Sequence, residues 1–255
     1  MSLYNPNGNI YHFPPIQDYK RRFNGNQGPN TGSMGCLVSQ NNSLHFLTDS
    51  DITYTQNINK QILENSPGYR GVLYGSYIKT TNGIKLIEIN CRFGDPECVV
   101  ALELLNESLY DLFKNISKSD SEPIKLTFKR EAVMGIYMVP RNYGSVSINN
   151  TCSLQNVISF NENYKENRDN IFMGDVRYNG ESYFTGTSRT LFICHRGSNI
   201  AECIDKVNNT IKCVDGTLDY RTDIGSDYKE KAYEECGVSV NRANEALKMI
   251  KSDIV

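Results

Sequence analysis

The sequence predicts an α+β fold in which antiparallel strands and amphipathic helices pack together. Residues Ile84 to Asn90 alternate between apolar and polar side chains, which is typical of a half-buried strand. Asp95-Pro96 opens an apolar run and predicts a helix to about Ile116, with Asp95 as its N-cap. A second helix, around Ile200 to Cys213, is predicted by an apolar stripe with helical spacing: Ile200, Ile204, Val207 and Ile211.

The remaining elements follow in chain order. Tyr4 to Phe13 predicts a hairpin with Asn7-Gly8 as its turn, and a further helix is expected near Ser50 to Glu64, packed on the first sheet. The expected organisation is a larger domain at 1–118 with an antiparallel sheet, a polar linker closed by Pro123, a small mixed-sheet domain at 124–225 and a helical tail at 226–255.

Composition excludes several classes of protein. The chain has 255 residues, a net charge of −2 and a pI near 6.0, so it offers no basic field for nucleic acid. No apolar run approaches membrane-spanning length, and 1–10 lacks the pattern of a signal peptide. The eight cysteines form no Cys-x-x-Cys pair, as in reduced proteins. We therefore expect a cytoplasmic protein.

One face of the strand at Ile84–Asn90 is a candidate metal site. Strand alternation places Leu86, Glu88 and Asn90 on the same face. A carboxylate and an amide oxygen suit Mg²⁺, which takes one or two protein oxygens and leaves its other positions to water and phosphates. The alternative is that both residues are solvated strand residues, because short motifs have many false matches.

Two neighbouring segments supply candidate anion and amine ligands. Arg92 stands before the helix that is predicted to begin at Asp95, where an anion would be held. Gln17 to Gly35 is rich in glycine and asparagine, so its backbone can approach a ligand and offer N–H donors. Asp18, Lys20 and neighbouring charges suit a phosphorylated, amine-bearing molecule. The segment matches neither the P-loop nor the Rossmann pattern.

Motif order connects these segments to a family. PP-x-QD-x-K, GPNTG-x-MG, GYRGVLYGSY and EINCRFGDPE follow one another as in the later half of glycinamide ribonucleotide synthetase (phosphoribosylamine-glycine ligase), an ATP-grasp enzyme, which the chain closely resembles. The resemblance extends through EAVMGIY and TSRTLF to YRTDIG, so it covers about Tyr11 to Gly225. It implies that 1–118 is the carboxy-terminal part of an ATP-grasp domain and that 124–225 is the ligase's carboxy-terminal domain.

The resemblance implies an activity and residue roles. ATP would phosphorylate the carboxylate of glycine, and the amine of 5-phosphoribosylamine would attack the acyl phosphate, a step of purine biosynthesis. The cofactors would be ATP and Mg²⁺ or Mn²⁺. The roles carried over are metal binding, substrate binding and catalysis: Glu88 and Asn90 for the metal; Asp18, Lys20, Asn30, Thr31 and Arg92 for the substrates; Arg92 and Asp95 for catalysis.

The chain also departs from the family. Tyr19 stands where histidine is usual, Ser33 replaces one glycine of a pair, and Asp175 replaces threonine. The family's amino-terminal half, with its adenine-binding segment, is expected as a separate partner, and exposed apolar surface would favour self-association. The tail after Gly225 resembles the leader of aminoimidazole ribonucleotide synthetase, as in a multifunctional enzyme, or is an ordinary amphipathic helix. The alternative function is a non-catalytic module that binds a ligand or partner.

Overall fold

The computed structural model describes residues 1–5, 9–118, 122–144 and 156–228. Its central sheet has the strand order β11-β14-β9-β6-β3, with β16 also paired to β9. β3 and β6 come from the first half of the chain and the other strands from the second half, so one sheet crosses the expected domain boundary. These strands are β3 (Gln17–Asp18), β6 (Gly35–Val38), β9 (Ala132–Pro140), β11 (Ile171–Met173), β14 (Leu191–Gly197) and β16 (Leu218–Asp219).

The centre of this sheet is fully buried. Every residue of β6 and β9 is buried, as a strand covered on both faces must be. β6 pairs with β9 in register from Gly35–Ile136 to Val38–Val133. A side chain at Gly135 would overlap the ring of Phe192 on the next strand, so only glycine lets the two strands pack at this point.

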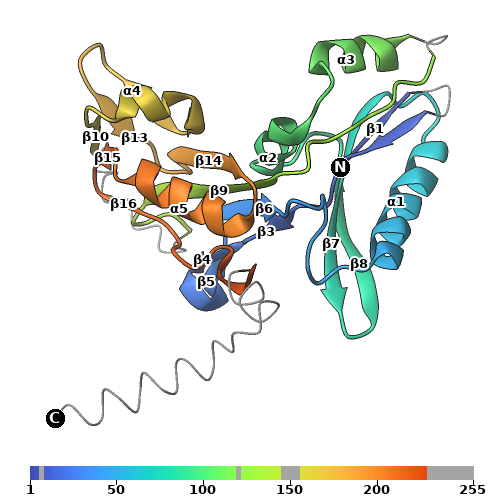
Figure 1. Cartoon of the computed structure of the whole chain (residues 1–255), viewed down its shortest axis with the longest axis horizontal. Coiled ribbons are helices and arrows are strands. Elements are labelled where there is room, and N and C mark those ends of the chain that lie inside the picture. The colour runs from blue at the N-terminus through green and yellow to red at the C-terminus, as the bar shows by residue number, and fades with distance from the viewer. Residues whose placement is uncertain (6–8, 119–121, 145–155, 229–255) are drawn as a thin grey trace.

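A second sheet, ordered β2-β1-β7-β8, carries helix α1 (Asp49–Glu64) along it (Figure 1). The predicted hairpin is confirmed as the antiparallel pair β1–β2, although its turn at 6–8 lies outside the described residues. The predicted helix is confirmed too, and a Thr48–Asp51 capping box explains where it begins. The strands are β1 (Ser2–Tyr4), β2 (Ile10–His12), β7 (Gly71–Thr80) and β8 (Gly83–Asn90).

The helix predicted from Asp95 to Ile116 is two helices, α2 (Glu97–Leu104) and α3 (Leu109–Ser117). Leu105 leaves the helix in an extended conformation and forms a bridge with Phe128, while Glu107 accepts hydrogen bonds from the backbone and hydroxyl of Thr127. Ser108 then caps α3. The prediction of one continuous helix was wrong because a distant segment pairs with residues 105–107.

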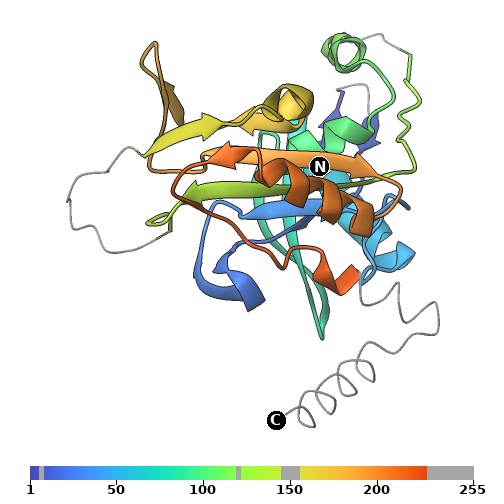
Figure 2. The same ribbon diagram turned by 60° about the vertical axis from the view of Figure 1, so that its left-hand side comes forward.

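The second half adds a small sheet, β12-β13-β10-β15, and helix α5 (Ile200–Ile211). Figure 2 shows α5 lying across the central sheet, and its four predicted stripe residues are all buried there. The α+β class is confirmed, but every strand pair in the described ranges is antiparallel rather than mixed. The other elements are β10 (Val157–Phe160), β12 (Val176–Tyr178), β13 (Tyr183–Thr185), β15 (Val214–Asp215), α4 (Tyr164–Asn167) and η2 (Arg168–Asn170).

Two buried arginines attach the hairpin β4–β5 (Arg21–Phe23 and Gln27–Asn30, joined by the 3-10 turn η1, Asn24–Asn26) to the end of the described chain. Arg221 is 1% exposed and binds both oxygens of Asp223, the Arg21 carbonyl and the Asn26 side chain. Arg22 is 2% exposed and binds Asp219 at 2.9 Å and backbone carbonyls at 140, 141 and 143. The hairpin is therefore held from the second half of the chain.

No helix within residues 1–5, 9–118, 122–144 and 156–228 is long and apolar enough to cross a bilayer. The tail residues 229–255, with their predicted helix and their resemblance to a leader, lie outside the described residues.

Replacing Arg221 should unfold the hairpin attachment. Arg221→Met removes the donor of the Arg21 carbonyl and of the Asn26 side chain and leaves the Asp223 carboxylate with the Gly25 N–H, so we expect a loss of about 3 kcal/mol in the free energy of unfolding, the size found when a buried pair loses one partner. Urea denaturation measures it. The control is Arg141→Met, which removes a 76% exposed guanidinium 3.8 Å from Asp219 and should change stability by less than about 0.5 kcal/mol. Equal effects of both variants would contradict the argument.

A second prediction concerns pH. Burial, and then the charge of Lys206, lowers the pKa of His195 to about 4. The unfolded chain therefore binds this proton more tightly, and stability is lost as the pH falls from about 6.5 toward 4. His195→Gln removes the titration and keeps a partner for the Thr210 hydroxyl, which lies 2.7 Å from His195 Nε2. Urea denaturation at pH 7 and pH 5 should show a smaller loss in the variant; identical losses would refute the assignment.

Candidate functional site

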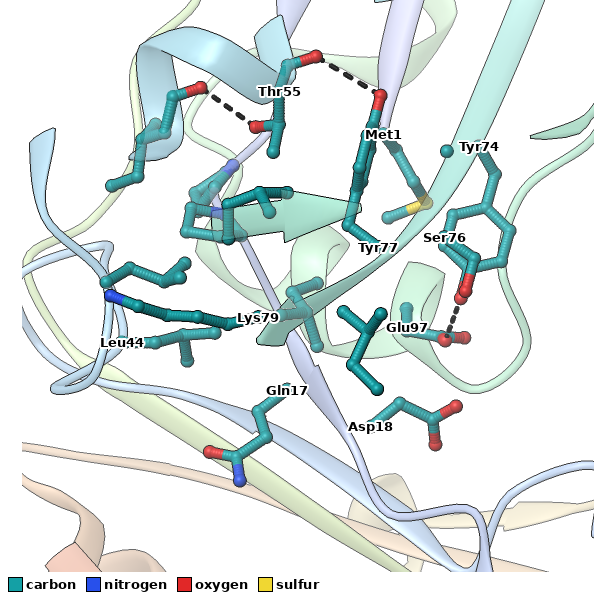
Figure 3. A pocket seen from close by; sticks show the side chains of 18 of the residues that line it. Met1, Gln17, Asp18, Leu44, Thr55, Tyr74, Ser76, Tyr77, Lys79 and Glu97 are labelled. Atoms are coloured by element: carbon teal, nitrogen blue, oxygen red, sulfur yellow. Dashed lines mark hydrogen bonds between the residues drawn. The ribbon is translucent and has the colours of Figure 1, made fainter. Parts of the chain in front are cut away.

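The candidate site is a cavity of about 770 Å³ between helix α1, strand β7, strand β3 and residues 44–47 (Figure 3). Its two ends differ in chemistry. One end is polar and is lined by Asp18, Lys20, Tyr74, Ser76 and Glu97, whereas the other is mainly apolar and is lined by Leu44, Phe46, Leu47, Ile52 and Ile84. Lys79 on the wall bonds Asp51 at 2.7 Å and so fixes residue 79 to the start of α1.

Asp18 and Lys20 form the first charged pair of the polar end. Lys20 Nζ lies 2.5 Å from Asp18 Oδ2. Asp18 Oδ1 is buried and has no hydrogen-bond partner among the described residues. Burial disfavours the charge of Lys20, but the carboxylates of Asp18, Glu97 and Glu88 together raise its pKa. Lys20 is therefore paired directly with Asp18 and is further stabilised as a cation by the charges of Glu97 and Glu88.

Glu97 is the most buried carboxylate of the cavity, with 3% of its surface exposed. The Tyr74 hydroxyl donates to its Oε1 at 2.6 Å, as Figure 3 shows. Burial, and then repulsion from Asp18, raises the pKa of Glu97, while the Tyr74 hydrogen bond and Lys20 oppose the rise. A Cβ at Gly94 would lie 2.6 Å from Glu97 Oε2, so glycine is needed beside it. The two carboxylates of Asp18 and Glu97 outnumber the single ammonium group of Lys20, so this end of the cavity favours a ligand that carries a positive charge.

The side chains of Glu88 and Asn90, which the sequence suggested as a metal pair, lie next to each other on β8. Asn90 Nδ2 donates to Glu88 Oε1 at 3.1 Å, and Glu88 is exposed. Leu86 does not share their face: the register with β7 shifts so that Ser76 faces Glu88 while Tyr77 faces Leu86, and Ile87 is the extra residue of a bulge. The sequence pattern could not reveal this bulge because the register of β7 defines it.

The last part of the glycine-rich segment does not offer the free backbone donors that its sequence suggested. The N–H groups of residues 31–35 are already bonded inside the protein: Thr31 to Lys20 O, Gly32 to the Tyr143 hydroxyl, Ser33 to Thr31 Oγ1, Met34 to Tyr19 O and Gly35 to Ser33 Oγ. The Thr31 hydroxyl also donates to Lys20 O at 2.8 Å. The loop therefore shapes the site by holding Lys20 rather than by presenting its own amides.

Asp95 has a different position from the one predicted. It does not cap α2, whose N-cap residue is Pro96 without a side-chain bond. Its carboxylate instead accepts from the Tyr137 hydroxyl at 2.6 Å and binds Arg189 Nη2 at 2.8 Å. Arg92 is exposed and donates to the Phe93 carbonyl, and Asn30 is exposed on β5. Of the predicted site residues, the structure thus brings Asp18 and Lys20 together in the cavity and Glu88 and Asn90 together on β8, and it places the Asp95 carboxylate with Tyr137 and Arg189.

Three residues of this region were missed by the sequence analysis: Tyr74, Glu97 and Arg189. Each lies in one of the motifs named above, GYRGVLYGSY, GDPE or TSRTLF. Its position in the site depends on a partner far along the chain, as in the Tyr74–Glu97 and Arg189–Asp95 hydrogen bonds. A glutamate directly after the Asp95-Pro96 turn was the one available signal for Glu97.

Comparison with known proteins agrees with these motifs. Residues 3–98 match the family model described as phosphoribosylglycinamide synthetase, ATP-grasp (A) domain. The phosphoribosylamine–glycine ligase of Methanosarcina acetivorans is 30% identical over 234 residues, which are 86% of this chain and 49% of that protein. The chain is similar to phosphoribosylamine–glycine ligases over about half of their length. The resemblance inferred from the motifs is therefore confirmed, and a ligase of Methanococcus maripaludis is 32% identical over the same shares of both chains.

Solved structures share the fold. The crystal structure of the Thermotoga maritima phosphoribosylamine–glycine ligase aligns with a TM-score of 0.69 at 24% identity, over 87% of this chain and 54% of that one. The biotin carboxylase subunit of a pyruvate carboxylase aligns with a TM-score of 0.57 at 14% identity, over 90% of this chain and 52% of that one. The chain spans about half the length of the ligases that it matches.

The raised pKa of Glu97 gives a stability prediction. Above the ordinary pKa of a glutamate, about 4.3, the buried charge destabilises the folded state. Glu97→Gln should therefore raise the free energy of unfolding at pH 7 by roughly 1 kcal/mol, the size typical of a single substitution, and the gain should shrink as the pH falls toward 4. Urea denaturation at both pH values measures it. Glu88→Gln, at an exposed position, is the control and should stay within about 0.5 kcal/mol of wild type. A loss of stability in Glu97→Gln at pH 7 that shrinks toward pH 4 would instead mean that the charge stabilises the fold, and a pH-independent change would mean that the charge does not affect stability.

Proposed function

We propose that this chain supplies the metal-binding and acceptor part of an ATP-dependent ligase that joins glycine to 5-phosphoribosylamine in purine biosynthesis. The observation that carries the proposal is the cavity end where Asp18, Lys20 and Glu97 meet, with the Glu88 carboxylate acting on the same lysine. Relatives with this name, which the chain matches over half of their length, support the choice of reaction.

The proposed chemistry has two steps. In the first, the carboxylate of glycine attacks the γ-phosphorus of ATP, forming a glycyl phosphate and releasing ADP. In the second, the amine of phosphoribosylamine attacks the acyl carbon, so the new C–N bond forms as phosphate leaves and the amine loses a proton. Reactions of this type depend mainly on positioning and charge stabilisation.

The residues of the cavity fit these steps. Asp18 and Glu97 are carboxylates that attract an ammonium group, which suits the amino end of glycine. Lys20 pairs with Asp18 and remains a cation, so it can neutralise a carboxylate or phosphate oxygen. Arg92 is exposed beside the end of β8 and is available to an anion. In the proposal, this end of the site is also shaped by Asn30, Thr31 and Asp95. Thr31 acts by holding the backbone carbonyl of Lys20.

Magnesium fits the pair on β8. Glu88 and Asn90 provide two adjacent oxygen-bearing side chains, which is the number that Mg²⁺ commonly takes from protein when nucleotide phosphates supply the rest. Manganese would use the same ligands. The described part of the chain has no cluster of three or more His, Cys, Asp or Glu residues suited to a metal. In the proposal, nucleotide phosphates and water would complete the coordination. When bound, the ion neutralises phosphate charge as the phosphoryl group moves.

A partner is part of the proposal. Large apolar side chains are exposed on β7 and β8: Ile78, Leu86, Ile87 and Ile89. Such a group at the edge of a sheet favours association with another surface. We propose that the remaining half of the ligase, in the cytoplasm, covers this surface and supplies the adenine contacts; self-association would cover it in the absence of that partner.

Glycine- and phosphoribosylamine-dependent ADP release tests the proposal. It is measured for this chain alone and for this chain mixed with a separately produced amino-terminal half of a related ligase. Activity in the mixture supports the ligase assignment. No activity in either sample, with folded proteins, would favour the second candidate, a non-catalytic module that binds a ligand or partner.

The metal pair gives the sharpest variant. Glu88→Ala removes the only carboxylate of the pair, so we expect at least a 10-fold weaker Mg²⁺-dependent binding of an ATP analogue by calorimetry. Glu181→Ala, at an exposed turn between β12 and β13, is the matched control and should bind as wild type does. Undiminished binding by Glu88→Ala would exclude the metal assignment.

A further inference from the structure

Arg189 connects two segments that carry the polar end of the cavity. Its Nη1 donates to the Gly32 carbonyl at 3.2 Å and to the Asp95 carbonyl at 2.7 Å, and its Nη2 binds Asp95 Oδ2 at 2.8 Å. Gly32 follows Thr31, whose hydroxyl holds the backbone of Lys20. Asp95 lies two residues before Glu97. One guanidinium therefore spans the loop that holds Lys20 and the turn that holds Glu97.

The surroundings of Arg189 make this connection rigid. The guanidinium lies over the Tyr137 ring, 4.8 Å from its centroid, and the Tyr137 hydroxyl binds the other oxygen of the same Asp95 carboxylate. Before Arg189, the Asp175 carboxylate accepts from the backbone N–H groups of Thr187 and Ser188. Asp175 thus holds the backbone immediately before Arg189, and Tyr137 packs against the guanidinium.

We propose that Arg189 is a positioning residue for the acceptor end of the site, one that sets the separation between the Gly32 loop and the Asp95–Glu97 turn. The acceptor end is the polar end of the cavity that contains Asp18, Lys20 and Glu97. The binding part of this inference rests on the proposed function; the ordering of the two segments does not. Arg189 lies outside residues 3–98, so the second half of the chain contributes directly to the geometry of the site.

Lysine cannot replace this arginine. The planar guanidinium serves three acceptors with a fixed geometry, whereas an ammonium on a flexible stem is a point charge. Arg189→Lys should therefore keep the positive charge beside Asp95 and lose the connection to Gly32. A misplacement of about 1 Å at a site of this kind can lower activity by about 100-fold.

The first measurement is the amide hydrogen-exchange rate of residues 28–35 and residues 93–98 in the whole chain. The second is the affinity of the chain for glycinamide ribonucleotide and for a magnesium-bound ATP analogue. Arg189→Lys should exchange at least 10-fold faster in both segments and bind glycinamide ribonucleotide at least 10-fold more weakly, with unchanged nucleotide affinity. Tyr137→Phe removes one partner of Asp95 and should loosen only 93–98. Arg196→Lys is the matched control. Like Arg189, Arg196 binds both carboxylate and carbonyl oxygens: the carboxylates of Glu103 and Glu131 and the carbonyl of Glu103. It lies outside the cavity lining.

The outcomes are distinguishable. Unchanged exchange in both segments of Arg189→Lys would overturn the proposal, as would equal changes in Arg196→Lys. Faster exchange with an unchanged affinity for glycinamide ribonucleotide would also overturn it, because Arg189 would then have a structural role only. If the wild-type chain binds no glycinamide ribonucleotide, the acceptor assignment under the proposed function fails, and the exchange rates alone decide whether Arg189 orders the two segments.

Discussion

The attachment of the β4–β5 hairpin by Arg22 and Arg221 is the constraint on which the site depends. A buried guanidinium is costly unless its donors are satisfied. Both arginines meet this condition through acceptors from two distant segments: residues 21–26 of the hairpin for Arg221, and residues 140–143 and Asp219 for Arg22. Separating the segments would leave Arg22 without Asp219 and Arg221 without two of its acceptors, the Arg21 carbonyl and the Asn26 side chain, so the attachment favours one position of the hairpin.

The polar end of the cavity brings together buried charges that lower the stability of the folded state. Burial and the neighbouring Asp18 raise the pKa of Glu97, and the Tyr74 hydroxyl, a backbone hydrogen bond and Lys20 partly offset the rise. Natural proteins retain such arrangements at binding sites, where activity is gained at the expense of stability. A ligand that brings an ammonium group would supply the missing positive charge. This is the physical reason for placing the amine of the substrate here under the proposed function.

Local patterns predicted the elements whose causes are local. The β8 strand, the α1 helix with its Thr48 cap and the buried stripe of α5 could be read from spacing and capping residues. The features that differ have distant causes: Phe128 interrupts the predicted helix at Leu105, and Tyr143 is the partner that takes the Gly32 amide. Asp95 is a good N-cap by sequence, yet Arg189 lies 94 residues away and binds it instead. Among site residues, the spacing of Glu88 and Asn90 is a local property, whereas the position of Glu97 relative to Asp18 is not.

The two ends of the proposed site differ in how far this chain completes them. The acceptor end is lined by residues from the first half of the chain, and Arg189, which lies beyond the residues that match the family model, joins two of the segments that carry them. The metal pair instead lies on β8, an edge strand of its sheet among the described residues, with exposed apolar neighbours on both sides. A nucleotide held there would need contacts from a second surface, because two side chains and a metal ion bind phosphates but leave the base in solvent. The asymmetry therefore explains why acceptor binding and nucleotide binding should respond to different variants of this chain, and why only nucleotide binding should depend strongly on a partner.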